Sequence, residues 1–156
     1  MLKIAVITAS DRAYKGEYKD LSGPKIKEII NNSNIDAEVS LFIVPDEKEK
    51  IKKVIEKKIG VDYIITTGGT GISPRDVTPE VTESICTREL PGISEMLRME
   101  SYKETKNALF SRAFSGVKEN TIIINFPGSV KAVAFCTKLV IPILEHGIKM
   151  LYGGKH

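Results

Sequence analysis

Residues 64–80 read IITTGGTGISPRDVTPE and combine a short apolar run, a glycine turn, a cation, an acid and a helix start. The apolar run predicts a buried strand, because it is rich in β-branched residues and ends at glycines. Thr78, followed by Pro79 and Glu80, is typical of a helix start, since proline suits the first turn and an acid there favours the helix dipole. A strand, a glycine turn and a helix N-terminus in this order form an anion-binding site.

Four short runs predict the strands of the sheet, because they are rich in β-branched residues and bounded by polar or Gly/Pro clusters. These runs are Leu2–Thr8, Ala37–Val44, Tyr63–Thr67 and Thr121–Phe126. The first, third and fourth are almost continuously apolar, as expected of strands covered on both faces, whereas the second alternates with more polar residues. We therefore expect three inner strands and one strand nearer an edge.

Helical patterns lie between these strands. Ser22 is a candidate N-cap for a helix that carries Pro24 in its first turn. Asp46 is a candidate N-cap for the next helix, with Glu49 three residues later as in a capping box. Strands alternating with helices predict an α/β fold, a three-layer α/β/α sandwich with a mostly parallel central sheet.

The C-terminal part of the chain is predicted to be helical. Residues 90–120 are irregular, with Leu109 and Phe110 among their apolar anchors, and a long final helix follows Ser129. A glycine pair, Gly153-Gly154, ends that helix.

Length and composition predict a single domain, residues 1–156, because a chain of this size can bury about 70% of its unfolded surface. The 23 basic and 20 acidic residues are spread along the chain, so nothing prompts a nucleic-acid partner. No apolar run reaches the roughly 20 residues that a membrane helix needs. With no leader pattern after Met1, we expect a cytoplasmic location and no membrane association.

Polar residues follow each predicted strand, where ligands bind in an open parallel sheet. Ser10-Asp11 follow the first strand and Asp46 the second, while the glycine loop follows the third and Pro127-Gly128-Ser129 the fourth. Hydroxyl groups and helix-start amides suit phosphate, although serine and aspartate after strands are also common turn formers.

The glycine loop matches neither common nucleotide pattern. A Walker loop needs a lysine that is missing between Gly68 and Glu80, and a dinucleotide fingerprint from Gly69 would need a glycine where Pro74 stands. The loop can be a tight turn in which glycine permits positive φ. We favour a ligand-binding loop, because four polar or charged side chains accompany the glycines: Thr67, Thr70, Ser73 and Arg75.

Asp46 and Asp76 each have a structural interpretation, as an N-cap and as a charge that favours a helix dipole. Together, at the same end of one sheet and beside a phosphate loop, they can hold Mg²⁺ against a nucleotide, since Mg²⁺ prefers carboxylate and phosphate oxygens. Phosphoryl-type transfer needs positioning and charge neutralisation more than a protein nucleophile. Backbone amides of Gly68–Gly71 can cradle phosphate, and Arg75 can offset developing charge.

In this order, the segments resemble the molybdopterin adenylyltransferase family of MogA and MoaB type, which is related to domains of gephyrin and of plant homologues. The matching segments are residues 10–12 (SDR), 44–47 (VPDE), 66–71 (TTGGTG), 74–80 (PRDVTPE), 88–92 (RELPG), 111–112 (SR) and 125–129 (NFPGS).

This resemblance implies a MoaB/MogA-like fold that assembles as a homotrimer or a trimer-based hexamer. It implies adenylylation of molybdopterin by Mg²⁺ and ATP, giving adenylyl-molybdopterin and pyrophosphate, and possible contact with other proteins of molybdenum cofactor biosynthesis. Asp46 and Asp76 match the family's catalytic and metal-binding acids. The residues that match its pterin- and nucleotide-binding surroundings are Ser10, Asp11, Thr67, Gly68, Gly69, Thr70, Gly71, Ser73, Arg75, Ser111, Asn125, Pro127, Gly128 and Ser129. An alternative within the family is a non-catalytic module that binds or carries molybdopterin.

Overall fold

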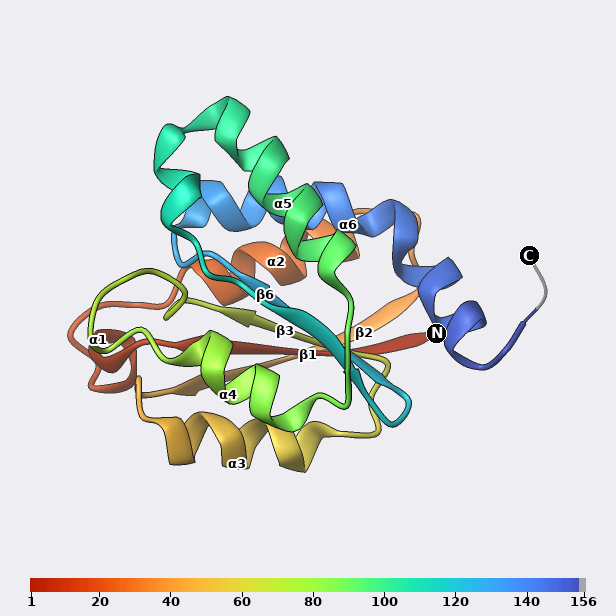
Figure 1. Cartoon of the computed structure of the whole chain (residues 1–156), viewed down its shortest axis with the longest axis horizontal. Coiled ribbons are helices and arrows are strands. Elements are labelled where there is room, and N and C mark those ends of the chain that lie inside the picture. The colour runs from red at the N-terminus through yellow and green to blue at the C-terminus, as the bar shows by residue number, and fades with distance from the viewer. Residues whose placement is uncertain (155–156) are drawn as a thin grey trace.

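A six-stranded sheet forms the centre of the protein, in the order β2-β1-β3-β6-β5-β4. We analysed a computed structural model that describes residues 1–154, so the last two residues of the predicted domain lie outside the described part. The parallel strands are β1 (Leu2–Ala9), β2 (Ala37–Val44), β3 (Tyr63–Thr67) and β6 (Thr121–Phe126) (Figure 1). The predictions of a mostly parallel sheet, of three inner strands and of an edge strand at 37–44 are confirmed.

Helices cover both faces of the sheet. On one face lie α2 (Ser22–Asn31), α5 (Pro91–Glu104) and α6 (Val130–Leu151), and on the other lie α3 (Lys48–Lys58) and α4 (Thr78–Ile85) (Figure 1). Each inner strand contributes side chains to the cores on both faces of the sheet, because successive side chains along a strand point to opposite faces. Ile4 and Val6 of β1 pack in the first core, and Ala5 and Ile7 in the second. The predicted three-layer fold is confirmed.

Two strands were missed, one within residues 90–120, which were predicted to be helical and irregular, and one just before them. β4 (Arg88–Glu89) and β5 (Ser115–Lys118) extend the sheet beyond β6 in the antiparallel direction. A 3₁₀ helix (Lys106–Phe110) follows α5, and its Leu109 and Phe110 are 64% and 59% exposed, so their prediction as apolar anchors is wrong. β5 forms because it pairs with β6 through a tight connection, which its weak strand propensity does not reveal.

Both predicted helix caps are wrong in detail. α2 begins at Ser22 itself, and the Asp20 carboxylate accepts hydrogen bonds from the Ser22 and Gly23 amides at 3.0 and 3.3 Å. α3 begins at Lys48 after Glu47, with no side-chain cap, so Asp46 does not form a capping box. The Asp46 side chain is therefore available for a different role.

The predicted helix start at Thr78 and the predicted long final helix after Ser129 are confirmed. Ser129 caps α6, and its side chain accepts a hydrogen bond from the Ala132 amide at 3.1 Å. α6 ends at Leu151, just before the predicted glycine pair. The short helix α1 (Asp11–Tyr14) follows β1. Within residues 1–154, no helix has the length and apolar character needed to span a membrane.

Candidate active site

The carboxyl ends of the four parallel strands meet at one edge of the sheet. Ala9 of β1 lies opposite Val44 of β2, and Thr67 of β3 lies beside both Thr8 of β1 and Phe126 of β6. The loops that follow these strands are therefore neighbours in space. This is the edge at which ligands bind in an open α/β sheet.

A cleft of about 260 Å³ opens at this edge. Six of the predicted residues line it: Ser10, Asp46, Thr67, Gly68, Gly128 and Ser129. Other residues that line it, which sequence reasoning missed, come from the segment before α2 and the first residue of that helix: Tyr18, Lys19, Asp20, Leu21 and Ser22. The Ser22 hydroxyl donates to the Gly128 carbonyl at 2.7 Å and so joins this segment to the turn after β6. The sequence contains both polar turns, but only the folded chain brings them together.

Glycine is required at position 68 because β1 approaches the turn closely. Gly68 has φ +92°, and a Cβ there would lie 2.4 Å from the Ala9 carbonyl oxygen. The Gly68 amide donates to the Phe126 carbonyl at 3.3 Å, and the Thr67 hydroxyl donates to the Pro127 carbonyl at 2.7 Å. The ends of β1, β3 and β6 are thus held together at this turn.

The next three amides of the loop remain free to bind a ligand. In the described part of the chain, the N–H groups of Gly69, Thr70 and Gly71 have no hydrogen-bond acceptor. Consecutive free amides form a concave site for anions. Gly68 itself is excluded from such a cradle, because its amide is bonded to the strand end.

Asp11 and Asp46 tie the ends of β1 and β2 together. The Asp11 amide donates to Asp46 Oδ2, and the Asp46 amide donates to Asp11 Oδ1, each at 3.0 Å. Arg75 adds a bidentate contact to the Asp11 carboxylate, at 3.0 Å from Nε and 2.8 Å from Nη2. These side-chain bonds from Arg75 hold the pKa of Asp11 below its usual value, so Asp11 stays ionised.

Asp46 has an environment unlike that of Asp11. Burial raises the pKa of Asp46, and the negative charges of Asp11 and Asp76 raise it further, against the lowering effect of the Asp11 amide. Asp46 Oδ1 is buried and has no hydrogen-bond partner in residues 1–154. An unpaired carboxylate oxygen in a buried position is costly unless a cation or a donor fills the space beside it.

Asp76 lies at the end of the glycine loop, with its carboxylate beside Gly71. Its Oδ2 accepts a hydrogen bond from the Ser73 amide at 3.0 Å, and its own amide donates to the Ser73 carbonyl at 2.9 Å. Asp76 is close enough to Asp46 to influence its pKa. In residues 1–154, no group of three or more His, Cys, Asp or Glu side chains is arranged to hold a metal ion. The two carboxylates fit Mg²⁺ only as a partial set, completed by substrate phosphate oxygens.

Arg112 fixes the glycine loop from outside, a role that sequence reasoning did not assign to it. Its Nε donates to the Gly71 carbonyl and its Nη2 to the Asp76 carbonyl, both at 2.8 Å, while its amide donates to the Thr70 carbonyl at 2.8 Å. Its third nitrogen forms an ion pair with Glu80. Arg112 therefore links the start, the middle and the end of the loop.

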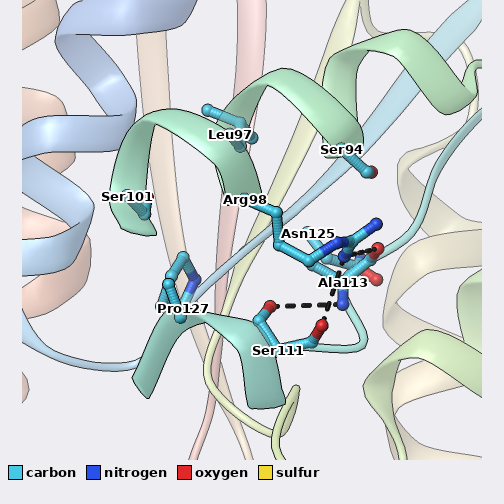
Figure 2. Close-up of a pocket in the computed structure, with 9 residues that line it drawn as sticks. Ser94, Leu97, Arg98, Ser101, Ser111, Ala113, Asn125 and Pro127 are labelled. Carbon is cyan, nitrogen blue, oxygen red and sulfur yellow. Dashed lines mark hydrogen bonds between the residues drawn. The ribbon is translucent and has the colours of Figure 1, made fainter. Parts of the chain in front are cut away.

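Three predicted site residues lie around a separate pocket of only about 20 Å³, enough for about one water molecule (Figure 2). These residues are Ser111, Asn125 and Pro127. The Asn125 amide group donates to the hydroxyls of Thr66 and Thr82, each at 2.9 Å, and its carbonyl accepts from the Phe114 amide. The structure thus separates Ser111 and Asn125 from the large cleft, and Asn125 is fully engaged within the core.

Arg98 braces this second pocket. Its Nη1 donates to the carbonyls of Ser111 and Ala113 at 3.3 and 3.0 Å, and Figure 2 shows these contacts converging on the segment after the 3₁₀ helix. The segment that carries Arg112 is therefore held in place from α5.

Comparison with known proteins now identifies the family. Residues 5–146 match the family described as a probable molybdopterin binding domain. The chain belongs to this family. A molybdopterin adenylyltransferase of Helicobacter pylori strain 26695 is 39% identical over 156 residues, which cover 97% of this chain and 89% of that protein. The family predicted from the sequence is confirmed.

Solved structures of this family have the same fold. The molybdopterin biosynthesis enzyme MoaB from Thermus thermophilus is 37% identical, with a TM-score of 0.89 over 98% of both chains. The tungsten cofactor synthesizing protein MoaB from Pyrococcus furiosus is 34% identical, with a TM-score of 0.87 over 97% of both chains. The predicted MoaB/MogA-like architecture is therefore confirmed for the whole sheet and its helical layers.

Proposed function

We propose that this protein acts in molybdenum cofactor biosynthesis as a molybdopterin adenylyltransferase. In the proposed reaction, an oxygen of the terminal phosphate of molybdopterin attacks the α-phosphorus of ATP. The bond from that phosphorus to the bridging oxygen breaks, giving adenylyl-molybdopterin and pyrophosphate. Relatives that carry this name, from Helicobacter pylori and Haemophilus influenzae, support the reaction class, and the matches cover 89% and 70% of those proteins.

The observation that carries the proposal is the pairing of a buried, unpartnered Asp46 oxygen with a loop of free amides at one edge of the sheet. A polyphosphate substrate needs both features, since its oxygens require N–H donors and its charge requires neutralisation. Asp46 and Asp76 would hold Mg²⁺, which supplies charge neutralisation for the phosphates when it is bound.

The other residues bind and orient the substrates. We assign the phosphate cradle to the amides of Gly69, Thr70 and Gly71. Arg75 is held by Asp11 and keeps further guanidinium N–H groups that can offset charge on the reacting phosphate. Ser129 caps α6, and the amides at the start of that helix can bind an anion in the cleft.

The polar wall of the cleft completes the substrate surface. Tyr18 binds the Ser10 hydroxyl at 3.0 Å, and Asp20 accepts from the Thr8 hydroxyl at 2.8 Å. Both contacts fix the segment before α2 against the end of β1. A preformed wall lowers the ordering cost of holding two substrates in a reactive arrangement.

The test is to mix the purified protein with molybdopterin and Mg·ATP and to measure pyrophosphate release. Asp46→Asn is expected to lower turnover by roughly two orders of magnitude or more, because it removes a charged oxygen ligand of the Mg²⁺ that would neutralise the reacting phosphates. Asp36→Asn is the matched control, since Asp36 is a 79% exposed acid that pairs with the N-terminal amine, and it should keep full turnover. Molybdopterin binding without any pyrophosphate release would instead identify a carrier module.

The assembly and location stay predictions. We expect a homotrimer or a trimer-based hexamer in the cytoplasm, with other proteins of molybdenum cofactor biosynthesis as candidate partners. Light scattering after size-exclusion chromatography gives the mass of the assembly directly.

A further inference from the structure

Two buried oxygen atoms lack hydrogen-bond partners, and they face the same glycine. Among residues 1–154, the buried side-chain atoms without a partner are Asp46 Oδ1 and Thr78 Oγ1. A Cβ placed on Gly69 would lie 2.4 Å from Thr78 Oγ1 and 3.1 Å from Asp46 Oδ1. Both oxygens therefore border the small space that the missing side chain of Gly69 leaves open.

Thr78 has no structural use for its hydroxyl. The residue is fully buried at the first position of α4, whose N-cap is Val77. The Thr78 amide donates to the Gly69 carbonyl at 3.1 Å, and its carbonyl accepts from the Thr82 hydroxyl at 2.9 Å. Those backbone bonds hold Thr78 in place without its hydroxyl, and an unsatisfied buried hydroxyl is unfavourable in the folded protein.

We infer that the Thr78 hydroxyl is a protein oxygen of the divalent-cation site, alongside Asp46 Oδ1. Mg²⁺ prefers oxygen ligands, and a threonine hydroxyl at a helix start is a known ligand of Mg²⁺ beside phosphates. A cation would satisfy both oxygens at once. The two carboxylates of the proposed function were an incomplete ligand set, and Thr78 adds a neutral oxygen beside Gly69.

Glycine at position 69 is needed for this site on two grounds. Its φ of +67° is unfavourable for other residues, and a side chain would occupy the space that the two oxygens border. Gly69→Ala should therefore abolish cation binding. Because that variant can also disturb the fold, the decisive variants are at Thr78.

The inference rests on the proposed function only in assuming that a divalent cation acts here. The test measures binding of Mn²⁺ alone to the full chain, by electron paramagnetic resonance of the free ion, with no ATP or molybdopterin present. Thr78→Val keeps the shape of the side chain and removes the hydroxyl, and it should raise the Mn²⁺ Kd about tenfold. Thr78→Ser keeps the hydroxyl and should bind within about threefold of wild type.

Thr82→Val is the matched structural control on the same helix. The Thr82 hydroxyl is buried and bonds to the Thr78 carbonyl and the Asn125 amide. Its removal should lower the Tm without changing the Mn²⁺ Kd. Thr78→Val should leave the metal-free Tm unchanged or raise it, because it removes an unsatisfied polar atom.

Three results would overturn the inference: unchanged Mn²⁺ binding by Thr78→Val, a metal-free Tm for that variant as low as that of Thr82→Val, or no Mn²⁺ binding by the wild-type protein. Intact Mn²⁺ binding without pyrophosphate release would reject the proposed function alone. If the wild-type protein releases pyrophosphate but Thr78→Val binds Mn²⁺ as tightly as the wild type does, this inference alone is rejected.

Discussion

Replacing Arg112 with methionine should loosen the glycine loop and lower the free energy of unfolding. The substitution keeps a long apolar stem and removes the guanidinium, which donates to the Gly71 and Asp76 carbonyls and pairs with Glu80. The Arg112 amide, which donates to the Thr70 carbonyl, is left intact. The change is therefore confined to the side-chain contacts.

The magnitude follows from these contacts. Each hydrogen bond from the charged group to a backbone carbonyl contributes roughly 1 kcal/mol, once the 38% exposure of the Arg112 side chain is taken into account. The partly exposed pair with Glu80 adds about 0.5 kcal/mol. We expect a total loss of about 2–3 kcal/mol. Arg112→Lys should recover only part of it, because one ammonium cannot replace a planar group with several donors.

Urea unfolding followed by circular dichroism measures this loss, and hydrogen exchange reports the loop itself. The amides that follow the glycines, up to Asp76, should exchange faster in Arg112→Met, while those of β1 and β3 should not change at equal stability. Lys103→Met is the control, because Lys103 pairs with Glu100 on an exposed helix surface and should cost about 0.3 kcal/mol. A loss for Arg112→Met below about 0.5 kcal/mol, with unchanged loop exchange, would refute the reasoning.

Three further predictions concern the pH dependence of stability, thiol reactivity and packing. Burial alone would raise the pKa of Glu80, but hydrogen bonds, including one from Arg112, lower it below its ordinary value. The ionised Glu80 side chain therefore stabilises the folded protein at pH values above its ordinary pKa of about 4.3. This stabilisation is lost as the pH falls through the folded-state pKa. The difference in unfolding free energy between wild type and Glu80→Gln should thus be constant from pH 7 to about pH 5 and shrink as the pH falls below about 4.3. Burial raises the pKa of Cys86 and Cys136 to about 11, so alkylation of the folded protein at pH 8, followed by mass spectrometry, should be roughly a hundredfold slower than for a free thiol. Gly147→Ala should destabilise the protein by about 1–3 kcal/mol in thermal unfolding, because its Cβ would lie 2.4 Å from the Tyr63 hydroxyl oxygen, and Tyr63→Phe should remove that penalty.

The sequence was sufficient to predict the parallel part of the fold. The strands β1, β2, β3 and β6 carry strong local signals, since their apolar residues are either continuous or alternating. β5 carries no such signal, with one valine between a glycine and a lysine, and it becomes a strand by pairing with β6. Pairing energy depends on the partner strand, and local propensity does not contain it.

The role of a site residue can also depend on partners that are distant in the sequence, and Asp46 is an example. Asp46 was predicted both as a helix cap and as a metal ligand, because the spacing to Glu49 fits a capping box. In the folded chain, Asp46 exchanges hydrogen bonds with Asp11, 35 residues earlier, and it does not cap α3. Local spacing could not choose between the two roles, because the deciding partner is distant in sequence.

By itself, the sequence determined the four parallel strands, the main helices between and after them, the glycine loop after β3 and the family to which the chain belongs. These follow from local patterns and from motifs of a few residues. Only the tertiary structure decided that Arg112 holds the loop, that the segment before α2 forms a wall of the cleft, and that Asp46 and Thr78 share the space beside Gly69. Burial and hydrogen-bond satisfaction belong to contacts between distant segments, so they appear only when the chain is folded.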